Sequence, residues 1–354
     1  MMGLDTAQQH FLSLVHDGES ITDSLWKNLS WQGLAWHGAE IRQCIFENNA
    51  FSEMDWRSCH VDESVFAGVR WSDTALKDCV FSSCRFVNCV FERGTFHTNQ
   101  FLGCAFEGCV FSECRYNEGM LVKAPILDLQ IEASQIEKLV MSHNEQVRLG
   151  FKDSDFQHLV MTDFNFENLT LENTRFTNLI ALECTARDYS FQGMHLVQAQ
   201  FTDSDMAGSD FSQADLSQAC LKGCDLQACR FDRATVRQAL IIEANATNAV
   251  FAGAQLESAN FSGTNCEGAN FRGADMTMTI LNRSNLQHAD FSDCSMSFTD
   301  FSYSNISYAN FRGGRFMRSK HHAVIDHETR YGSKSGILSP DHALLQAEQW
   351  VKLS

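Results

Sequence analysis

The sequence predicts a solenoid of stacked four-sided coils, because its apolar residues recur in one frame of five. Between Ala199 and Phe231 each five reads small, polar, large apolar and then two mostly polar residues. An amphipathic helix repeats about every 3.6 residues and a half-buried strand about every 2, so neither accounts for this spacing. Each five is therefore one short side of a coil that turns a corner.

The frame runs without insertion or deletion from Trp26 to Phe316. Twenty-five of the 28 phenylalanines occupy its large position, and Phe164 and Phe298 are the exceptions within this span. Every fourth large position gives one uniform column, namely Phe191, Phe211, Phe231, Phe251, Phe271, Phe291 and Phe311. A second period of 20 residues predicts four sides to a coil, with identical rings stacked one coil apart.

The triplets Ala214-Asp215-Leu216, Ala259-Asn260-Phe261 and Ala289-Asp290-Phe291 carry a family resemblance. In this pattern the chain resembles the pentapeptide-repeat proteins over about residues 22–318. The resemblance implies an all-β fold, a right-handed four-sided parallel β-helix. Some members mimic duplex DNA and inhibit or protect type II topoisomerases, whereas others look like secreted effectors or accessory proteins of secretion systems.

Three segments are expected along the chain. Residues 1–21 form an N-terminal capping helix, because Thr6 begins a capping-box match and Gly18 ends the apolar run. The β-helix follows over 22–318. Residues 319–354 form a C-terminal cap, in which the frame fails at His321 and a short helix begins with Ser339 as N-cap.

Residues 120–150 are expected to be irregular, and a joint between two parts of the solenoid is one interpretation. Leu129, Leu139 and Leu149 replace the small residue there, Gln146 replaces a large one, and Pro125 interrupts the strand pattern.

Aromatic and sulfur-containing residues fit the core better than a binding site. Trp26, Trp31 and Trp36 occupy successive large positions, which favours core packing over an exposed stacking platform. Twelve of the 14 cysteines take the small inward position and predict buried, reduced thiols, with metal or disulfide roles as the alternative. These twelve are Cys44, Cys59, Cys79, Cys84, Cys89, Cys104, Cys109, Cys114, Cys184, Cys224, Cys229 and Cys294.

Composition argues against catalysis and against direct nucleic-acid binding. The formal net charge is -17, yet residues 312–354 contain 7 basic and 4 acidic residues, so an acidic solenoid ends in a basic segment. No nucleotide, zinc or nucleophile motif is visible, and the spacing of His321, His322 and His327 matches no ligand set. We therefore expect no enzyme, no cofactor and no metal. Without a leader or a long apolar run we also expect no membrane association and a cytoplasmic location, with signal-less export left open.

The expected function is a rigid scaffold that binds a protein partner through flat solenoid faces, including an accessory or cargo role in a bacterial secretion system. The alternative is a DNA-mimicking binder of a type II topoisomerase, although residues 201–311 carry under half of the charge density of DNA. Predicted partner-binding residues are an Asp/Asn face (Asp205, Asp210, Asp215, Asp225, Asp275, Asp290 and Asp300) and three valines (Val80, Val90 and Val110). Predicted cap or homodimer contacts are Leu344, Leu345, Trp350 and Val351.

Overall fold

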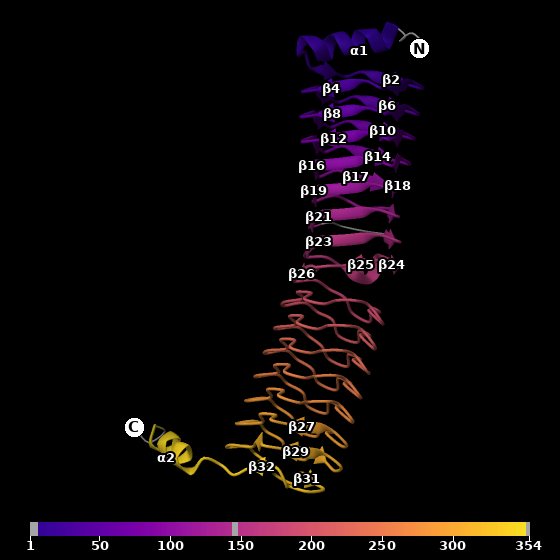
Figure 1. Ribbon diagram of the computed structural model, residues 1–354. Helices are drawn as coiled ribbons and strands as arrows, with labels where there is room; N and C mark the ends of the chain where they lie inside the picture. The colour runs from indigo at the N-terminus through magenta and orange to yellow at the C-terminus, as the bar shows by residue number, and fades with distance from the viewer. Residues whose placement is uncertain (1–5, 144–147, 352–354) are drawn as a thin grey trace. The chain divides into compact units, whose positions relative to one another are not determined.

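The computed structural model describes residues 6–143 and 148–351 (Figure 1). The chain divides into two compact units, Met1–Leu179 and Ile180–Ser354, called here the N-terminal and C-terminal units. Each unit is a stack of coils whose backbones pair in parallel with a shift of 20 residues. The predicted parallel β-helix fold is confirmed.

In the N-terminal unit, strands of successive coils form sheets along the sides, and the register pairs Trp31 with Phe51 and Phe46 with Phe66. One side contains β2 (Leu25–Lys27), β6 (Ile45–Glu47), β10 (Val65–Ala67), β14 (Arg85–Val87) and β17 (Ala105–Glu107). The next contains β3 (Ser30–Gln32), β7 (Ala50–Ser52), β11 (Arg70–Ser72), β15 (Val90–Glu92), β18 (Cys109–Ser112), β20 (Leu129–Glu132), β22 (Leu149–Lys152) and β24 (Leu169–Glu172).

The other two sides of this unit share one sheet, because its longer strands pass around a corner. Its strands are β1 (Ile21–Thr22), β4 (Ala35–His37), β5 (Glu40–Arg42), β8 (Asp55–Arg57), β9 (His60–Asp62), β12 (Ala75–Lys77), β13 (Val80–Ser82), β16 (Thr95–Leu102), β19 (Arg115–Val122), β21 (Gln135–Ser142), β23 (Asp155–Thr162) and β25 (Arg175–Phe176). A single 3-10 turn, η1 (Phe166–Asn168), precedes β24.

The first coil of the N-terminal unit is covered by helix α1 (Thr6–Asp17), which lies across it in Figure 1. Phe11 of this helix is fully buried and its ring lies 5.1, 5.1 and 4.3 Å from the rings of Trp26, Trp31 and Trp36. Gln8 adds a hydrogen bond from its Nε2 to the carbonyl of Ser30 at 2.7 Å. The three tryptophans are buried, so the core interpretation is confirmed and the helix closes the end of the stack.

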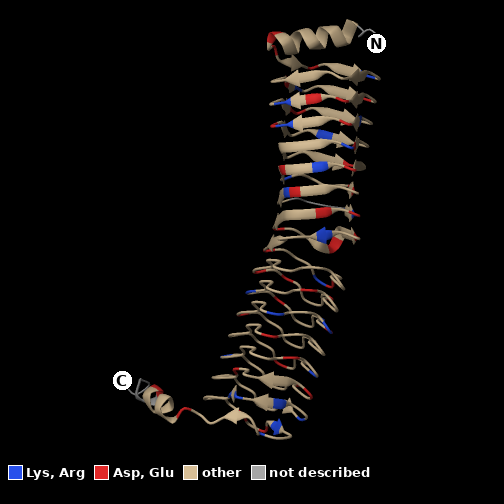
Figure 2. Ribbon diagram, in the orientation of Figure 1, with Lys and Arg blue, Asp and Glu red and all other residues tan. Residues whose placement is uncertain are grey.

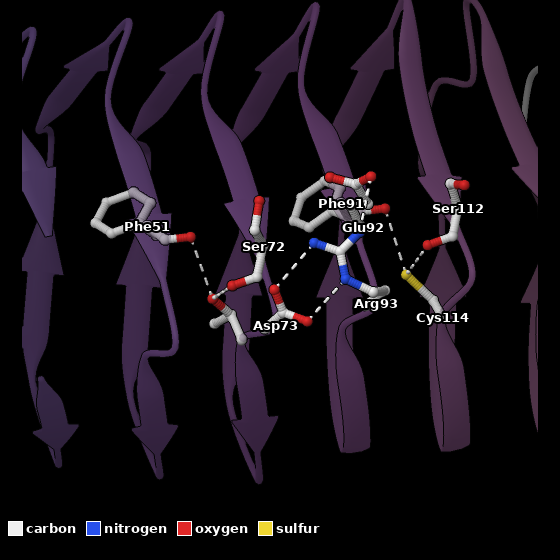
Figure 3. A network of polar contacts seen from close by, with 9 residues as sticks. Phe51, Ser72, Asp73, Phe91, Glu92, Arg93, Ser112 and Cys114 are labelled. Carbon is white, nitrogen blue, oxygen red and sulfur yellow. Dashed lines mark hydrogen bonds and ion pairs between the residues drawn. The ribbon is translucent and has the colours of Figure 1, made fainter. Parts of the chain in front are cut away.

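Corners are made by two recurring devices. The second residue after each large one usually has a left-handed backbone, as at Asn48 (φ 52°) and Gly68 (φ 62°). The small inward residue hydrogen-bonds to carbonyls of its own coil and of the coil before it. In Figure 3 the thiol of Cys114 donates to the carbonyls of Ser112 and Phe91 at 3.3 and 3.4 Å. Serine, threonine and cysteine at this position therefore satisfy backbone acceptors inside the core.

Around residues 120–150, where irregularity was expected, the coils lose a strand and bury larger residues at the small position. Pro125 to Asp128 form no strand, and Ile126 makes only an isolated bridge to Phe106. Leu129, Leu139 and Leu149 are buried at positions that hold small residues elsewhere. Gln146 lies outside the described residues, and a joint at this point remains a prediction.

The C-terminal unit keeps the 20-residue register but forms few regular strands. After β26 (Ile180–Leu182) its coils are joined mainly by single bridges, such as Asp205 with Asp225. The phenylalanine column stacks almost parallel, with Phe211 and Phe231 5.0 Å apart at an interplanar angle of 5°. Its remaining elements are β27 (Ser295–Ser297), β28 (Asn310–Phe311), β29 (Arg315–Met317), β30 (Ser319–Lys320), β31 (Arg330–Tyr331), β32 (Ile337–Leu338) and α2 (His342–Val351).

The coil geometry continues past Phe316, where the sequence frame was expected to fail at His321. His321 is 8% exposed and takes the large inward position, with its ring 4.9 Å from that of Phe301. Burial lowers the pKa of His321 to about 4, so the ring is neutral at pH 7 and packs as an aromatic residue. Tyr331 then stacks on Phe311 at 5.2 Å, one further coil along.

Helix α2 begins two residues later than expected. Oδ1 of Asp341 accepts a hydrogen bond from the backbone N–H of Leu344 at 3.0 Å, so Asp341 is the N-cap rather than Ser339. A carboxylate at this position also interacts favourably with the helix dipole. No helix in the described part of the chain is long and apolar enough to span a membrane.

The phenylalanine column generates a stability prediction. Phe251 is fully buried between Phe231 and Phe271, at 4.7 and 4.9 Å, so Phe251→Asp removes a ring and places a charge in the core. Loss of the ring alone costs about 3–5 kcal/mol, and the buried charge adds to it. We expect loss of soluble folded protein in circular dichroism and sedimentation, whereas exposed Gln255→Asp should behave like the parent. A folded Phe251→Asp protein would contradict the packing described here.

The contact between helix α1 and the first coils generates a second stability prediction. Phe11→Ala leaves a cavity against three tryptophans and should reduce the free energy of unfolding by about 3–5 kcal/mol. The tryptophan emission should shift to longer wavelength because water reaches Trp26 and Trp36. Exposed Gln9→Ala is the matched control, and an unchanged melting temperature and emission for Phe11→Ala would show that α1 does not close the core.

Candidate interaction surfaces

The interior offers thiols but no metal centre within the described residues. All 14 cysteines are free, and 13 of them, including the twelve in-frame residues, are buried. The burial prediction is therefore confirmed for these twelve. Across residues 6–143 and 148–351 no group of three or more His, Cys, Asp or Glu side chains is placed to hold a metal ion.

Burial changes the acidity of these thiols. It raises the pKa of Cys114 to about 11 and the pKa of Cys224, Cys229 and Cys294 to about 12, above the ordinary value of 9.0. A thiol that stays protonated is a poor nucleophile and a poor metal ligand. These four inward cysteines are thus structural residues.

The seven aspartates that were expected to form one Asp/Asn face lie on all four sides of the C-terminal unit. One coil has four sides of five residues each, so only residues 20 apart lie on the same side. Two residues can therefore occupy the same position in the frame of five and still lie on different sides. Asp205 pairs with Asp225 on one side, Asp210 pairs with Arg230 on the next, and Asp215 pairs with Thr235 on the one after that. Asp275, Asp290 and Asp300 follow the same division, with Gln255, Asn270 and Ile280 as their respective partners. The single acidic face was therefore a wrong expectation.

Each of these aspartates has a structural task. Oδ1 accepts the backbone N–H two residues later, as in the bonds from Ser212 to Asp210 at 2.8 Å and from Ser302 to Asp300 at 2.9 Å. This local turn is the reason that Asp and Asn recur here. The Ser212 hydrogen bonds and Arg230 outweigh the effect of burial and lower the pKa of Asp210.

One side carries an unbroken column of Asp and Asn residues, defined here as the Asp/Asn column. Its members are Asp205, Asp225, Asn245, Asn265, Asn285 and Asn305. The amides bond from coil to coil, with Asn245 donating to Asp225 at 3.1 Å and Asn285 donating to Asn265 at 3.0 Å. The column is therefore rigid, half-buried and acidic only at Asp205 and Asp225.

Basic residues accompany the acidic ones in both units, which Figure 2 shows as blue and red interspersed along the coils. Arg187 lies 2.6 Å from Asp205, and His195 lies 3.7 Å from Asp215. In the N-terminal unit Arg93 binds Asp73 through two nitrogens at 2.8 and 3.0 Å (Figure 3). Exposed pairs of this kind contribute little stability, but they reduce the net field of the surface.

The three predicted valines are divided between two sides of the N-terminal unit. Val90 and Val110 pair directly in β15 and β18, as their spacing of 20 requires. Val80 belongs to β13 and lies between His60 and Gln100 in a different sheet. All three are half-buried, so Val90 and Val110 form a small apolar spot and Val80 does not join it.

Helix α2 is attached to the coils by polar contacts at Glu348. The hydroxyl of Tyr303 donates to Glu348, and the imidazole of His322 lies 3.5 Å from the same carboxylate. Leu344 is 43% exposed and Leu345 is half-buried, while the side chains of Trp350 and Val351 lie outside the described residues. A cleft of about 350 Å³ between this segment and the last coils is lined by Tyr303, Lys320, His322, Leu338 and Leu344.

The sequence reading missed a group of exposed apolar residues near the end of the C-terminal unit. Met278, Phe298 and Met317 are 52%, 41% and 50% exposed. The available signal was Phe298 itself, one of the two phenylalanines outside the frame. The other, Phe164, is buried and packs edge-to-face on Phe166 at 5.5 Å.

Two family models match the C-terminal unit. One described as a pentapeptide repeat region covers residues 194–271, and one described as pentapeptide repeats (8 copies) covers residues 279–316. No curated protein matches the chain.

Solved structures of low sequence identity also match. HetL, a pentapeptide-repeat protein involved in heterocyst differentiation regulation in the cyanobacterium Nostoc, is 15% identical over 82% of this chain and 97% of its own, with a TM-score of 0.24. QnrB1, a plasmid-mediated fluoroquinolone resistance protein, is 17% identical over 66% and 97%, with a TM-score of 0.25. A mannuronic acid-specific polysaccharide lyase from human gut microbiota is 8% identical over 98% and 92%, with a TM-score of 0.25.

The buried thiols predict a loss of stability in alkali. An unfolded thiol ionises near pH 9, whereas folded Cys224 and Cys229 keep their protons to about pH 12. Their contribution is therefore complete below pH 9 and falls as the pH rises towards 12. At pH 10 each such thiol should lower the free energy of unfolding by about 1 kcal/mol relative to pH 8.

Urea unfolding at pH 8 and pH 10 measures this effect. The double variant Cys224→Ala and Cys229→Ala should lose about 2–3 kcal/mol less than the parent over this range. Half-buried Cys220→Ala is the control for removal of a thiol. Equal alkaline losses in all three proteins would show that the inward thiols are not protected.

Proposed function

Since this chain is a pentapeptide-repeat protein, we propose that it acts as a non-enzymatic scaffold that binds a protein partner on the sides of its coils. The inward positions are filled by packed side chains, which supports a role for the outer sides rather than for an internal reaction site. The proposal includes a scaffold that serves as an accessory or cargo protein of a bacterial secretion system.

The observation that carries the proposal is the Asp/Asn column. Each of its side chains is oriented by a turn hydrogen bond, for example from Gln227 N–H to Asp225 at 3.1 Å, and several are joined to the next coil. Side chains that are ordered before binding lose little conformational entropy when a partner arrives. A rigid row of acceptors and donors is therefore suited to recognition of another protein.

A DNA-mimicking role is the second candidate, and the charge pattern supports it less. A DNA mimic needs a dense row of negative charges, since duplex DNA has about one charge per 1.7 Å. Here the aspartates are distributed over four sides, and Asp205 and Asp210 lie within 4 Å of Arg187 and Arg230. Inhibition or protection of gyrase supercoiling by the purified protein would nevertheless favour this candidate.

A homodimer through the C-terminal segment is also proposed. Leu344 remains 43% exposed on a helix whose Glu348 contacts Tyr303 and His322 of the coils. A second copy that covers this apolar side chain would remove it from water. Light scattering of the full chain and of Leu344→Asp reports the mass directly.

The test of the scaffold function compares two sides of the same unit. Immobilised full-length protein is exposed to native lysate, and captured proteins are identified and titrated. Asp205→Asn with Asp225→Asn removes two charges from the Asp/Asn column while an amide preserves the turns, so affinity should fall up to about tenfold and its salt dependence should weaken.

Asp215→Asn with Asp275→Asn removes two charges from another side and serves as the matched control. Melting temperatures should be nearly unchanged in both pairs, because exposed ion pairs add little stability. If Val90→Asp with Val110→Asp abolishes capture and neither aspartate pair does, the N-terminal unit is the binding region. Failure of every variant to change a specific capture, or the absence of any specific capture, would contradict the proposed function.

A further inference from the structure

One corner of the C-terminal unit exposes a compact apolar group near its end. The group consists of Met278, Ile280, Phe298 and Met317, which are 52%, 37%, 41% and 50% exposed. Phe298 lies one coil beyond Met278, and Ser297 pairs with Met317 in the next coil through β27 and β29, which neighbour each other in Figure 1. These residues, with Arg315 and Arg318, are called the apolar corner.

The same corner is polar in the preceding coils. Gln198, Gln218 and Gln238 occupy it, and the amides of Gln198 and Gln218 each donate to the next glutamine at 2.9 Å. Ser258 follows, and then Met278 and Phe298 replace the polar residues. Since glutamine and serine complete this corner without difficulty, the coil itself does not require an apolar residue there.

Met278 and Phe298 share the left-handed backbone of the other residues at this corner. Both have φ of 58°, close to the 61° of Gln218 and the 57° of Gln238, so they are exceptions in residue type and not in conformation. Among the described residues with positive φ, Phe and Tyr occur only at 298, 303 and 308, in one coil. Large apolar residues that are exposed where earlier coils have polar ones favour a functional explanation over a packing one.

Two arginines and one acidic residue, Asp300, lie beside the corner, and Asp300 pairs with Ile280. The guanidinium of Arg318 lies 5.9 Å from the centre of the Phe298 ring, and Arg315 belongs to the same strand as Met317. Neither arginine forms an ion pair with any residue that the structure describes. Nearby Lys320 is 3.9 Å from Asp300, so its charge is partly compensated.

We propose that the apolar corner binds an acidic segment of another protein that carries apolar side chains. This inference deepens the proposed scaffold function and rests on it. Apolar side chains of the partner would cover Met278, Phe298 and Met317, while its carboxylates would pair with Arg315 and Arg318. Methionine, phenylalanine and arginine are enriched in such interfaces.

A membrane surface fits the corner less well. Binding to anionic lipid relies on about 4–8 clustered basic residues, and the corner contributes two arginines without ion pairs. Phe298 and Met317 are also supported by paired backbone of adjacent coils rather than by an amphipathic helix. The protein partner is thus the occupant that both charge and composition support.

The test places a photo-crosslinker at Phe298. Benzoylphenylalanine replaces Phe298 in the full-length protein, which is irradiated in native lysate, and crosslinked segments are identified by mass spectrometry. We expect segments of other proteins that have net negative charge and contain Leu, Ile, Phe or Val. Benzoylphenylalanine at Gln218, four coils earlier at the same corner, should give few of them.

Two variants separate binding from folding. Phe298→Gly removes the ring and places a glycine at a left-handed position (φ 58°), so binding should fall at least fivefold while the melting temperature is nearly unchanged. Arg315→Glu with Arg318→Glu should also reduce crosslinking from position 298 at least fivefold, whereas Arg272→Glu, on another side, should not.

The outcomes distinguish this inference from the scaffold function. Crosslinks from position 298 to lipid, to basic segments, to a second copy of the chain or to nothing would overturn the apolar corner as a binding site. If Val90 or Asp225 positions then crosslink specifically to proteins, the scaffold function stands without it. If no position yields a specific protein crosslink, both proposals fail.

Discussion

The structure depends on one constraint: a coil of twenty residues buries its large side chains and satisfies its backbone only against its neighbours. Inward rings such as Phe231 are covered by Phe211 and Phe251 of adjacent coils, and each coil donates backbone hydrogen bonds to the next. A mismatch in length would displace every later ring from its column. This explains why the frame tolerates weak fillings such as Ala246 but contains no inserted residue.

The inward and outward positions could be predicted from the sequence because a single period of five sets them. Sides are harder to assign, since they require the residue number modulo 20 rather than modulo 5. Asp205 and Asp210 have the same position in the frame of five, but they lie on different sides of the coil. For that reason the aspartates of the expected acidic face are distributed over four sides. Single-residue exceptions were also beyond the pattern, because His321 packs as a neutral ring only after burial lowers its pKa.

At both ends of the solenoid, the helices could be predicted from the sequence pattern, but the contacts that fix them could not. Helix α1 was recognisable from its capping box and apolar spacing, but its depth of burial through Phe11 depends on three tryptophans of the first coils. At the other end Ser339 was the expected N-cap, but Asp341 takes the position because its carboxylate accepts a hydrogen bond from the N–H of Leu344. The exposed Phe298 was visible as an outlier, but its exposure and its arginine neighbour were not.

The strict register within the C-terminal unit also controls how such a surface can change in evolution. Duplication or loss of twenty residues would lengthen or shorten the stack and leave every outward column on its own side. A change of five residues would keep the core intact but turn all following sides by a quarter of a revolution, so that Asp225 and Asn245 would no longer belong to the same column. Insertions or deletions of five residues can therefore bring new combinations of outward side chains onto one side without changing the packing of the hydrophobic core.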